Sequence, residues 1–243
     1  MDLNLKAKLL GKQWYPPNLV FQRFNELVKK YSLEIVDTKV DFKSAREMRA
    51  VAFMLFGQHL NDGYKYMMLP ASETDETPDV YTLFQTEHPL HTHIQTVEVV
   101  TFKGNSGNDV GQFILDTKLL NRKKAYDAQT IILCEIRKET AINFDYLYKQ
   151  FRLTQFTPEN VYIIGEVRNS YDWLLTQVWP TFGQKQYSVV EQSNKYPVKK
   201  PSTYRSGQGD IINSVHNPNI QPHNMYEMFG LDEDSLNRKF GKD

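Results

Sequence analysis

The 243-residue sequence contains a single cysteine, Cys134, which excludes an internal disulfide and a cysteine-based zinc site. Long apolar runs are missing too: the longest, Ala50 to Phe56, is seven residues, far below the roughly 18 of a membrane-spanning helix. The 29 basic and 29 acidic side chains leave no net charge, which does not favour a nonspecific polyanion binder. The polar start lacks the apolar core of a secretory signal. These absences predict a soluble cytoplasmic protein, with Cys134 packed in a strand.

Several catalytic motifs are also absent. The sequence has no G-x-x-x-x-G-K-[ST] phosphate loop, no G-x-G-x-x-G and no G-x-S-x-G. Apolar residues make up 40% of the chain and aromatic residues 13%, which is enough for a real core. The chain is therefore expected to be globular, without the signature of a P-loop, dinucleotide-binding or α/β-hydrolase enzyme.

Apolar spacing outlines an α/β fold. Helices are predicted over 18–31, 44–59, 109–120, 144–153 and 170–178, and strands over 33–42, 64–69, 80–84, 94–102, 130–136, 161–167 and 186–191. This order predicts a mixed central sheet covered by helices on both sides, a three-layer α/β/α sandwich. From residue 193, prolines interrupt an Asn- and Ser-rich stretch. We therefore divide the chain into a domain over 1–192 and a loosely attached tail over 193–243 with short helices near 225–229 and 234–240.

Charge is unevenly distributed along the chain. Residues 70–98 contain no Lys or Arg but six acids and three histidines, whereas residues 99–124 contain five basic residues and two acids. A bound divalent cation stabilises such an acidic cluster, and a basic neighbour suits a phosphate-bearing substrate. The alternative is a solvated acidic hairpin beside a solvated basic helix.

Two acids carry a family resemblance. Pro78-Asp79 opens a predicted strand, Glu98 lies in the middle of the next one, and helices precede and follow the pair. This order, over residues 44–167, resembles the PD-(D/E)XK nuclease superfamily. The resemblance implies a restriction-endonuclease-like fold and a metal-dependent nuclease. Its expected substrate is DNA, with RNA as the second choice, and its expected role is restriction or defence against mobile elements. In such an enzyme Asp79, Glu98 and the carbonyl of Val99 hold Mg²⁺ or Mn²⁺, which activates a water for attack on the phosphodiester.

The sequence departs from the family at the lysine. The position two residues after Glu98 is Val100, and Lys103 is at odd spacing from Glu98, which places it on the other face of a regular strand. A weaker likeness to cap-snatching endonuclease domains, in which the lysine comes from the following helix, identifies Lys118 as the catalytic lysine, with Lys123 or Lys124 as substitutes. The same likeness makes His59, at the end of the preceding helix, a metal ligand.

Other readings of these residues stay open. Asp79 suits a turn opening, and Glu98 suits a structural ion pair with Lys118 or Arg122. Ser44 and Glu47 form an S-x-x-E capping box, which explains Glu47 without catalysis. Two more segments have two interpretations each. His88, His91 and His93 are either zinc ligands or part of a solvent-exposed turn. The basic and aromatic stretch 199–209, around Tyr204 and Arg205, either contacts nucleic acid or is a solvent-exposed linker.

The sequence thus supports two functions. The first is a phosphodiester hydrolase whose partners are nucleic acid and, since the chain is neutral, a partner protein or a second copy that supplies DNA affinity. The second is an inactive nuclease-like scaffold that kept binding to nucleic acid or protein after losing the E-x-K lysine. No membrane partner is expected.

Overall fold

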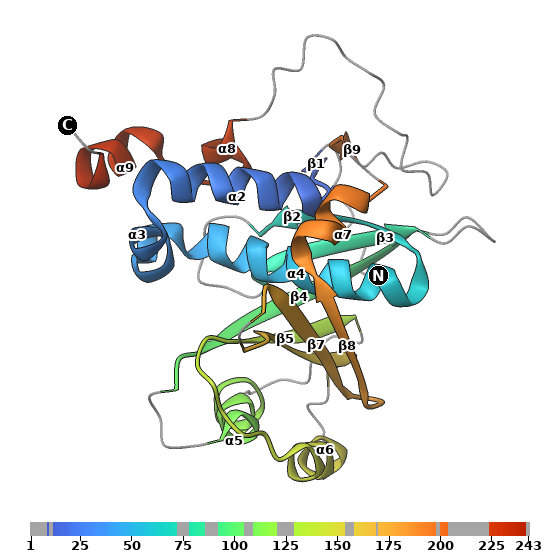
Figure 1. Ribbon diagram of the computed structural model, residues 1–243. Helices are drawn as coiled ribbons and strands as arrows, with labels where there is room; N and C mark the ends of the chain where they lie inside the picture. The colour runs from blue at the N-terminus through green and yellow to red at the C-terminus, as the bar shows by residue number, and fades with distance from the viewer. Residues whose placement is uncertain are drawn as a thin grey trace.

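The computed structural model of the chain describes residues 9, 12–71, 78–85, 92–104, 109–120, 129–153, 158–168, 170–197, 200–203 and 224–241. Seven strands form the central sheet: β2 (Lys65–Pro70), β3 (Val80–Gln85), β4 (Thr92–Phe102), β5 (Thr130–Ile136), β6 (Asn160–Glu166), β7 (Asp172–Trp179) and β8 (Gly183–Ser188). Their order in space follows their order in the chain. Strands β4, β5 and β6 run parallel and the other neighbours antiparallel. This confirms the α/β class with a mixed central sheet, which curls into a half-barrel (Figure 1).

The helices lie before, between and after these strands. They are α2 (Pro17–Tyr31), α3 (Leu33–Thr38), the 3-10 turn η1 (Val40–Phe42), α4 (Lys43–Asp62), α5 (Val110–Ile114), the π-helical turn η2 (Leu115–Leu120), α6 (Phe144–Leu153), α7 (Val189–Lys195), α8 (Met225–Phe229) and α9 (Glu233–Phe240). A two-residue ribbon joins β1 (Gln13–Trp14) to β9 (Ser202–Thr203).

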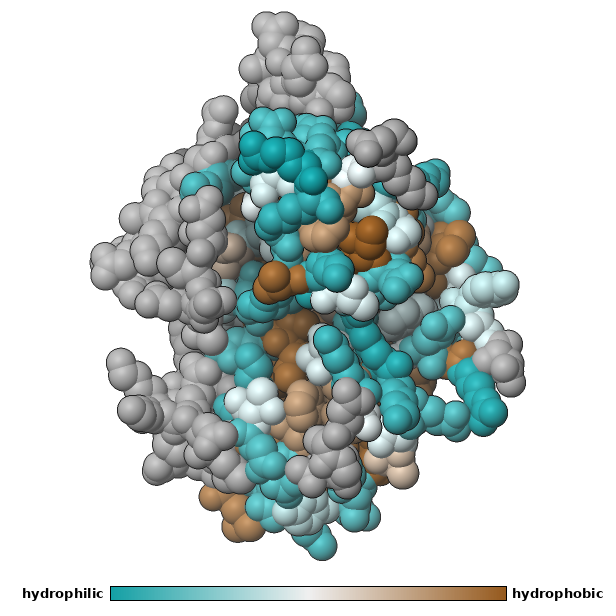
Figure 2. Space-filling model, turned by 90° about the vertical axis from the view of Figure 1, so that its left-hand side faces the viewer, coloured by the Kyte–Doolittle hydropathy of each residue, from teal (hydrophilic) through white to brown (hydrophobic). Residues whose placement is uncertain are grey.

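Side-chain alternation along β4 divides the core into two halves. Val97 and Val99 pack into the larger cluster with α2 and α4, whereas Val100 and Phe102 pack into the smaller one with α5 and α6. Helices therefore contact both faces of the sheet, α2 and α4 on one and α5 and α6 on the other (Figure 1). The face turned toward the viewer in Figure 2 is mostly polar, with its exposed apolar side chains in small patches.

Helix α4 lies close against the far strands of the sheet. A Cβ atom built on Gly57 would lie 2.7 Å from Leu175 Cδ2 and 2.9 Å from the Tyr187 ring. Glycine at this point allows the C-terminal half of the helix to approach β7 and β8. The hydroxyl of Tyr187 donates to the carbonyl of Phe53 and ties β8 to the same helix.

Two predicted elements are wrong. The 33–42 segment is helical because Ser32 caps the first turn, accepting from Ile35 N at 3.5 Å, and because Val36 is buried in the core. The 170–178 segment is strand β7, since Trp173 and Leu175 face the larger core cluster and Val178 faces the smaller one. In both segments tertiary burial overrides the local pattern. The last predicted strand, 186–191, is half right: Ser188 ends β8 and caps α7.

The described part of the C-terminal segment packs onto the domain. The division at residue 192 falls inside α7, and Tyr196 beyond it is 1% exposed. Helices α8 and α9 both occur as predicted, and Tyr226 and Leu236 from them join the larger core cluster. The Tyr31 hydroxyl donates to Asn237 Oδ1 at 2.7 Å, which fixes α9 beside α2. This part of the tail is therefore docked, not loosely attached.

Candidate functional site

The register of β3 and β4 brings Asp79 opposite Glu98. Val80 pairs with Val97, and the Asp79 N–H donates to the Val97 carbonyl at 3.0 Å. Strand β4 continues to Phe102 beside β5, but its ladder with β3 stops at Val97. At this fork the Asp79 carboxylate accepts the Val99 N–H at 2.7 Å. The two acids that the sequence singles out are therefore neighbours across two strands.

Glu98 points to the side of the sheet that α5 and η2 cover. Its side chain is 2% exposed, and Lys118 Nζ lies 3.3 Å from its Oε2. Lys118 belongs to η2 and is itself 16% exposed. This contact is the structural ion pair that the sequence left open for Glu98, and the catalytic role of Lys118 stays a prediction. Val100, at the usual position of the family's lysine, is 8% exposed and packs in the smaller core cluster.

Asp79 contacts the first turns of α4. Lys43 Nζ lies 3.5 Å from Asp79 Oδ1 and 3.2 Å from Glu47 Oε1. Both carboxylates are only 14% exposed. Burial, and then the charge of Asp79, raise the pKa of Glu47 from 4.5 to about 7. The site thus contains two mostly buried carboxylates beside one lysine, although the chain as a whole carries no net charge.

The capping box assigned to Ser44 and Glu47 is wrong. Helix α4 begins at Lys43, its N-cap is Phe42, and no side chain caps it. Phe42 is fully buried, so core packing sets the start of the helix two residues earlier than the motif predicts. Glu47 therefore has no capping role, and it takes part in the Asp79 cluster instead. The (i, i+4) spacing from Lys43 was the available sequence signal for this pairing.

The structure does not bring His59 to this cluster. His59 follows Glu47 by 12 residues in α4, a rise of about 18 Å. Its Nδ1 lies 2.7 Å from the Tyr64 carbonyl and its ring packs on Tyr196 at 5.0 Å between centroids. These contacts explain His59 as a helix-end histidine and remove the reason to count it as a ligand beside Asp79.

The remaining candidates are mostly outside the described residues. This holds for Lys123, Lys124 and Arg122, for His88 and His91, and for Tyr204 and Arg205. His93 is exposed and stacks on Phe84 at 4.8 Å. Cys134 is buried in the smaller core cluster, as expected. Among the described residues, no group of three or more His, Cys, Asp or Glu has the arrangement of a metal site.

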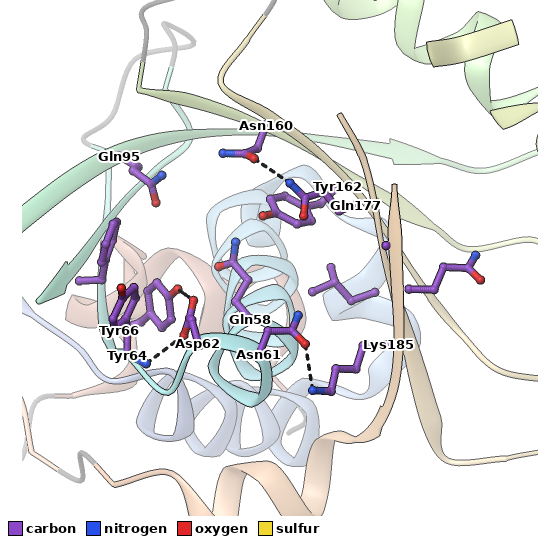
Figure 3. A pocket seen from close by; sticks show the side chains of 14 residues that line it. Gln58, Asn61, Asp62, Tyr64, Tyr66, Gln95, Asn160, Tyr162, Gln177 and Lys185 are labelled. Atoms are coloured by element: carbon purple, nitrogen blue, oxygen red, sulfur yellow. Dashed lines mark hydrogen bonds between the residues drawn. The ribbon is translucent and has the colours of Figure 1, made fainter. Parts of the chain in front are cut away.

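The structure contains a second candidate binding site that the sequence motifs do not predict. A cavity of about 330 Å³ lies between the last turns of α4 and the sheet, and amide and tyrosine side chains line it (Figure 3). Gln58, Gln95, Tyr162 and Gln177 come from four different elements, so no local motif announces them. The only available signal was a set of amides at strand positions, where polar side chains are uncommon inside a fold.

No family model matches the chain, and no curated protein matches it significantly. Within the described ranges, none of the helices combines the length and apolar character needed to cross a bilayer.

Proposed function

We propose that the chain is a divalent-metal-dependent nuclease that hydrolyses phosphodiester bonds in DNA, with RNA as the second choice. The observation that supports this proposal is the strand register that places Asp79 opposite Glu98 at the β3–β4 fork, with one ammonium group beside each carboxylate. The finer fold assignment, a three-layer restriction-endonuclease-like sandwich, belongs to the same proposal. Helices on both faces of the mixed sheet support it.

The donor atoms at the fork suit a hard cation. Asp79 and Glu98 supply carboxylate oxygens, and the Val99 carbonyl points to the same strand edge as its N–H, which Asp79 accepts. The raised pKa of Glu47 shows that burial and Asp79 disfavour further negative charge here, and a bound cation would relieve this. Mg²⁺ or Mn²⁺ held by these groups would supply a water of lowered pKa and a Lewis acid for the phosphate.

The lysines have separate roles in this proposal. Lys118, which contacts Glu98 from η2, neutralises charge that develops on the phosphate and orients the attacking water. In this proposal Lys118 takes the role of the lysine that the superfamily has two residues after the second acid, where this chain has Val100. Lys43 bridges Asp79 and Glu47 and keeps the Asp79 carboxylate at the fork. Glu47, with a pKa of about 7, is suited to accept a proton near neutral pH.

One observation favours a second candidate, an inactive scaffold that binds nucleic acid or protein. Asp79 bonds to Lys43 on the α4 side of the sheet, while Glu98 bonds to Lys118 on the α5 side. The two carboxylates thus have partners in different layers, and both ion pairs satisfy a structural role. Under either function, a partner protein or a homodimer supplies the nucleic-acid affinity that the neutral chain lacks.

Cleavage assays with Mn²⁺ separate the two functions. The substrates are plasmid DNA, single-stranded DNA and RNA, and the variants are Asp79→Asn and Glu98→Gln. We expect each variant to lose at least 100-fold in rate while Asp145→Asn, an exposed carboxylate on α6, keeps full activity. Millimolar Mn²⁺ is expected to raise the melting temperature of the wild type but not of Asp79→Asn. No cleavage and no Mn²⁺ shift in the wild type would support the scaffold.

A further inference from the structure

The amide-lined cavity has the size of a small-molecule site. Its volume is about 330 Å³, within the range of ligand pockets. Gln58 lines it from α4, Gln95 from β4, and Tyr162 and Gln177 from β6 and β7 (Figure 3). Gln95 is at odd spacing from Glu98, so the cavity opens on the other face of β4. The cavity shares no residue with the carboxylate fork.

The charged groups of the lining are already paired. Asp62 accepts the Tyr64 N–H at 2.9 Å with Oδ1 and the Tyr66 hydroxyl with Oδ2. Lys185 donates to the Leu60 carbonyl at 2.9 Å and to Asn61 Oδ1 at 2.9 Å. Asp62 and Lys185 are the only charged residues of the described lining. These bonds orient both charged groups toward protein atoms, and the rest of the described lining is uncharged, which favours a ligand without charge.

One buried acceptor in the lining has no partner. Gln58 is 8% exposed, and its Oε1 accepts no hydrogen bond within the described part of the chain. The other end of the amide interacts with Tyr162, whose pKa burial raises and the Gln58 hydrogen bond lowers. A buried amide oxygen without a donor is unfavourable and uncommon in folded proteins. Gln58 Oε1 is therefore placed to receive an N–H group from a ligand.

Aromatic rings at one end of the cavity offer a stacking surface. Tyr64 and Phe84 line the cavity and stack with centroids 5.5 Å apart at 14°. His93 extends the stack from the far side of Phe84, at 4.8 Å and 13°. Parallel flat rings of this kind are the surfaces on which proteins stack nucleobases.

We propose that this cavity binds a nucleobase that bears an exocyclic amine, as a nucleoside or as an unpaired nucleotide of a strand. The amine would donate to Gln58 Oε1. Gln95 Nε2 donates to Glu159 and Gln177 Nε2 to Asn160, each at 3.0 Å, so the amide oxygens of these two residues would accept the other N–H groups of the base edge. Tyr64 would stack on the ring. This inference does not depend on the nuclease proposal, because the two sites share no residue. They also lie at opposite ends of α4, where Asp79 contacts the first turns and the cavity is lined by the last turns.

Nucleoside pairs that differ at the exocyclic group test the proposal. Adenosine and inosine, and cytidine and uridine, differ in carrying an amine or a carbonyl at the same ring carbon. Isothermal titration of the full chain should show at least one amino nucleoside binding at least tenfold more tightly than its carbonyl counterpart. Equal affinities within each pair, or no binding up to 10 mM, would overturn the proposal. Tighter binding of ribose alone would identify a carbohydrate site instead and would also overturn it.

Variants at Gln58 distinguish a ligand contact from a structural role. Gln58→Leu removes the unpaired acceptor, which favours the fold, and the hydrogen bond to Tyr162, which disfavours it, at similar volume. We therefore expect little change in melting temperature together with at least a tenfold loss of nucleoside affinity. The matched control Gln186→Leu, an exposed β8 residue outside the cavity, should leave affinity unchanged. If Gln58→Leu does not fold, Tyr64→Leu provides the same test through the stacking ring. Undiminished binding by a folded variant of either residue contradicts the assignment.

Two further arms separate the possible sources of the base and the two proposed sites. A single-stranded oligonucleotide should compete with the nucleoside if strand bases enter the cavity, whereas an abasic oligonucleotide should not. Asp79→Asn should keep full nucleoside affinity even if it abolishes cleavage. Loss of nucleoside binding in Asp79→Asn at an unchanged melting temperature would contradict the independence of the cavity from the fork.

Discussion

The Lys118 ammonium lies 3.3 Å from a carboxylate oxygen of Glu98, a side chain that is 2% exposed. The two groups come from η2 and from the middle of β4, 20 residues apart in the chain. A carboxylate buried this deeply is tolerated only beside a cation or good hydrogen-bond donors. The contact therefore contributes to stability whether or not the fork is catalytic.

Removing the ammonium tests this directly. We expect Lys118→Met to lower the free energy of unfolding by about 3 kcal/mol, because it takes a cation from a buried carboxylate. Adding Glu98→Gln should recover most of that loss. Urea denaturation of the two single variants and the double variant at pH 7 gives the coupling energy. The control is Lys195→Met, whose pair with Glu191 is 69% and 64% exposed, and which should change stability by less than about 0.5 kcal/mol. Equal losses for the two lysines would contradict the pairing.

The corrected start of α4 makes a second prediction. Ser44 does not cap α4, whereas the Asp109 side chain caps α5 by accepting the Gln112 N–H at 2.8 Å. Asp109→Ala should therefore destabilise the chain by about 1 kcal/mol, and Ser44→Ala should change stability by less than about 0.5 kcal/mol. Thermal denaturation of both variants measures the difference. A larger loss from Ser44→Ala would restore the capping box.

Local sequence patterns predicted the elements that lead to the fork. The apolar run of β5 and the alternation of β4 are visible in the sequence, and both strands occur close to their predicted bounds. Lys118 could be predicted as the catalytic lysine because the position two residues after Glu98 is Val100 and because the helical segment that follows β4, formed by α5 and η2, contains Lys118. The (i, i+4) spacing of Lys43 and Glu47 is visible in the sequence, but the contact of Lys43 with Asp79 depends on long-range packing and on the burial of Phe42, which moves the start of α4.

Long-range packing explains what the sequence did not reveal. The cavity forms only when the last turns of α4 lie over β4, β6 and β7, which requires Gly57 against Leu175. Single amides on separate elements carry no spacing signal. The prediction of a helix at strand β7 is wrong for a related reason. Both faces of this strand are buried, so its sequence does not alternate between apolar and polar residues.

A buried ion network beneath α2 gives a third prediction. Arg49 of α4 pairs with Glu135 of β5, and Arg137 contacts the other Glu135 oxygen at 3.0 Å. Asp37 lies 3.3 Å from Arg49 and 3.2 Å from Arg137, which closes the network. The Glu135 side chain is 2% exposed, so removing one cation leaves charge that water cannot reach.

Arg49→Met should accordingly lower the free energy of unfolding by about 3 kcal/mol, part of it from the lost contact of the guanidinium with the Phe24 ring at 4.8 Å. Arg168→Met is the matched control, since its pair with Glu139 is 74% and 75% exposed, and it should cost less than about 0.5 kcal/mol. Guanidinium chloride would screen the charges, so urea is the denaturant of choice. Similar losses for both arginines would argue against a network that matters for stability.

Glu47 gives a prediction about pH. Burial and the Asp79 charge raise its pKa from 4.5 in the unfolded chain to about 7 in the fold. Between these values the folded state holds a proton that the unfolded state has released. The contribution of Glu47 to stability is therefore fully present below pH 4.5 and is lost as pH rises to 7. The fall from this group is at most about 3 kcal/mol. Glu47→Gln should remove that slope in urea denaturation from pH 4.5 to 8, whereas the exposed Glu34→Gln should retain it. Identical slopes in the wild type and Glu47→Gln would show that the carboxyl titrates normally and that Asp79 does not act on it.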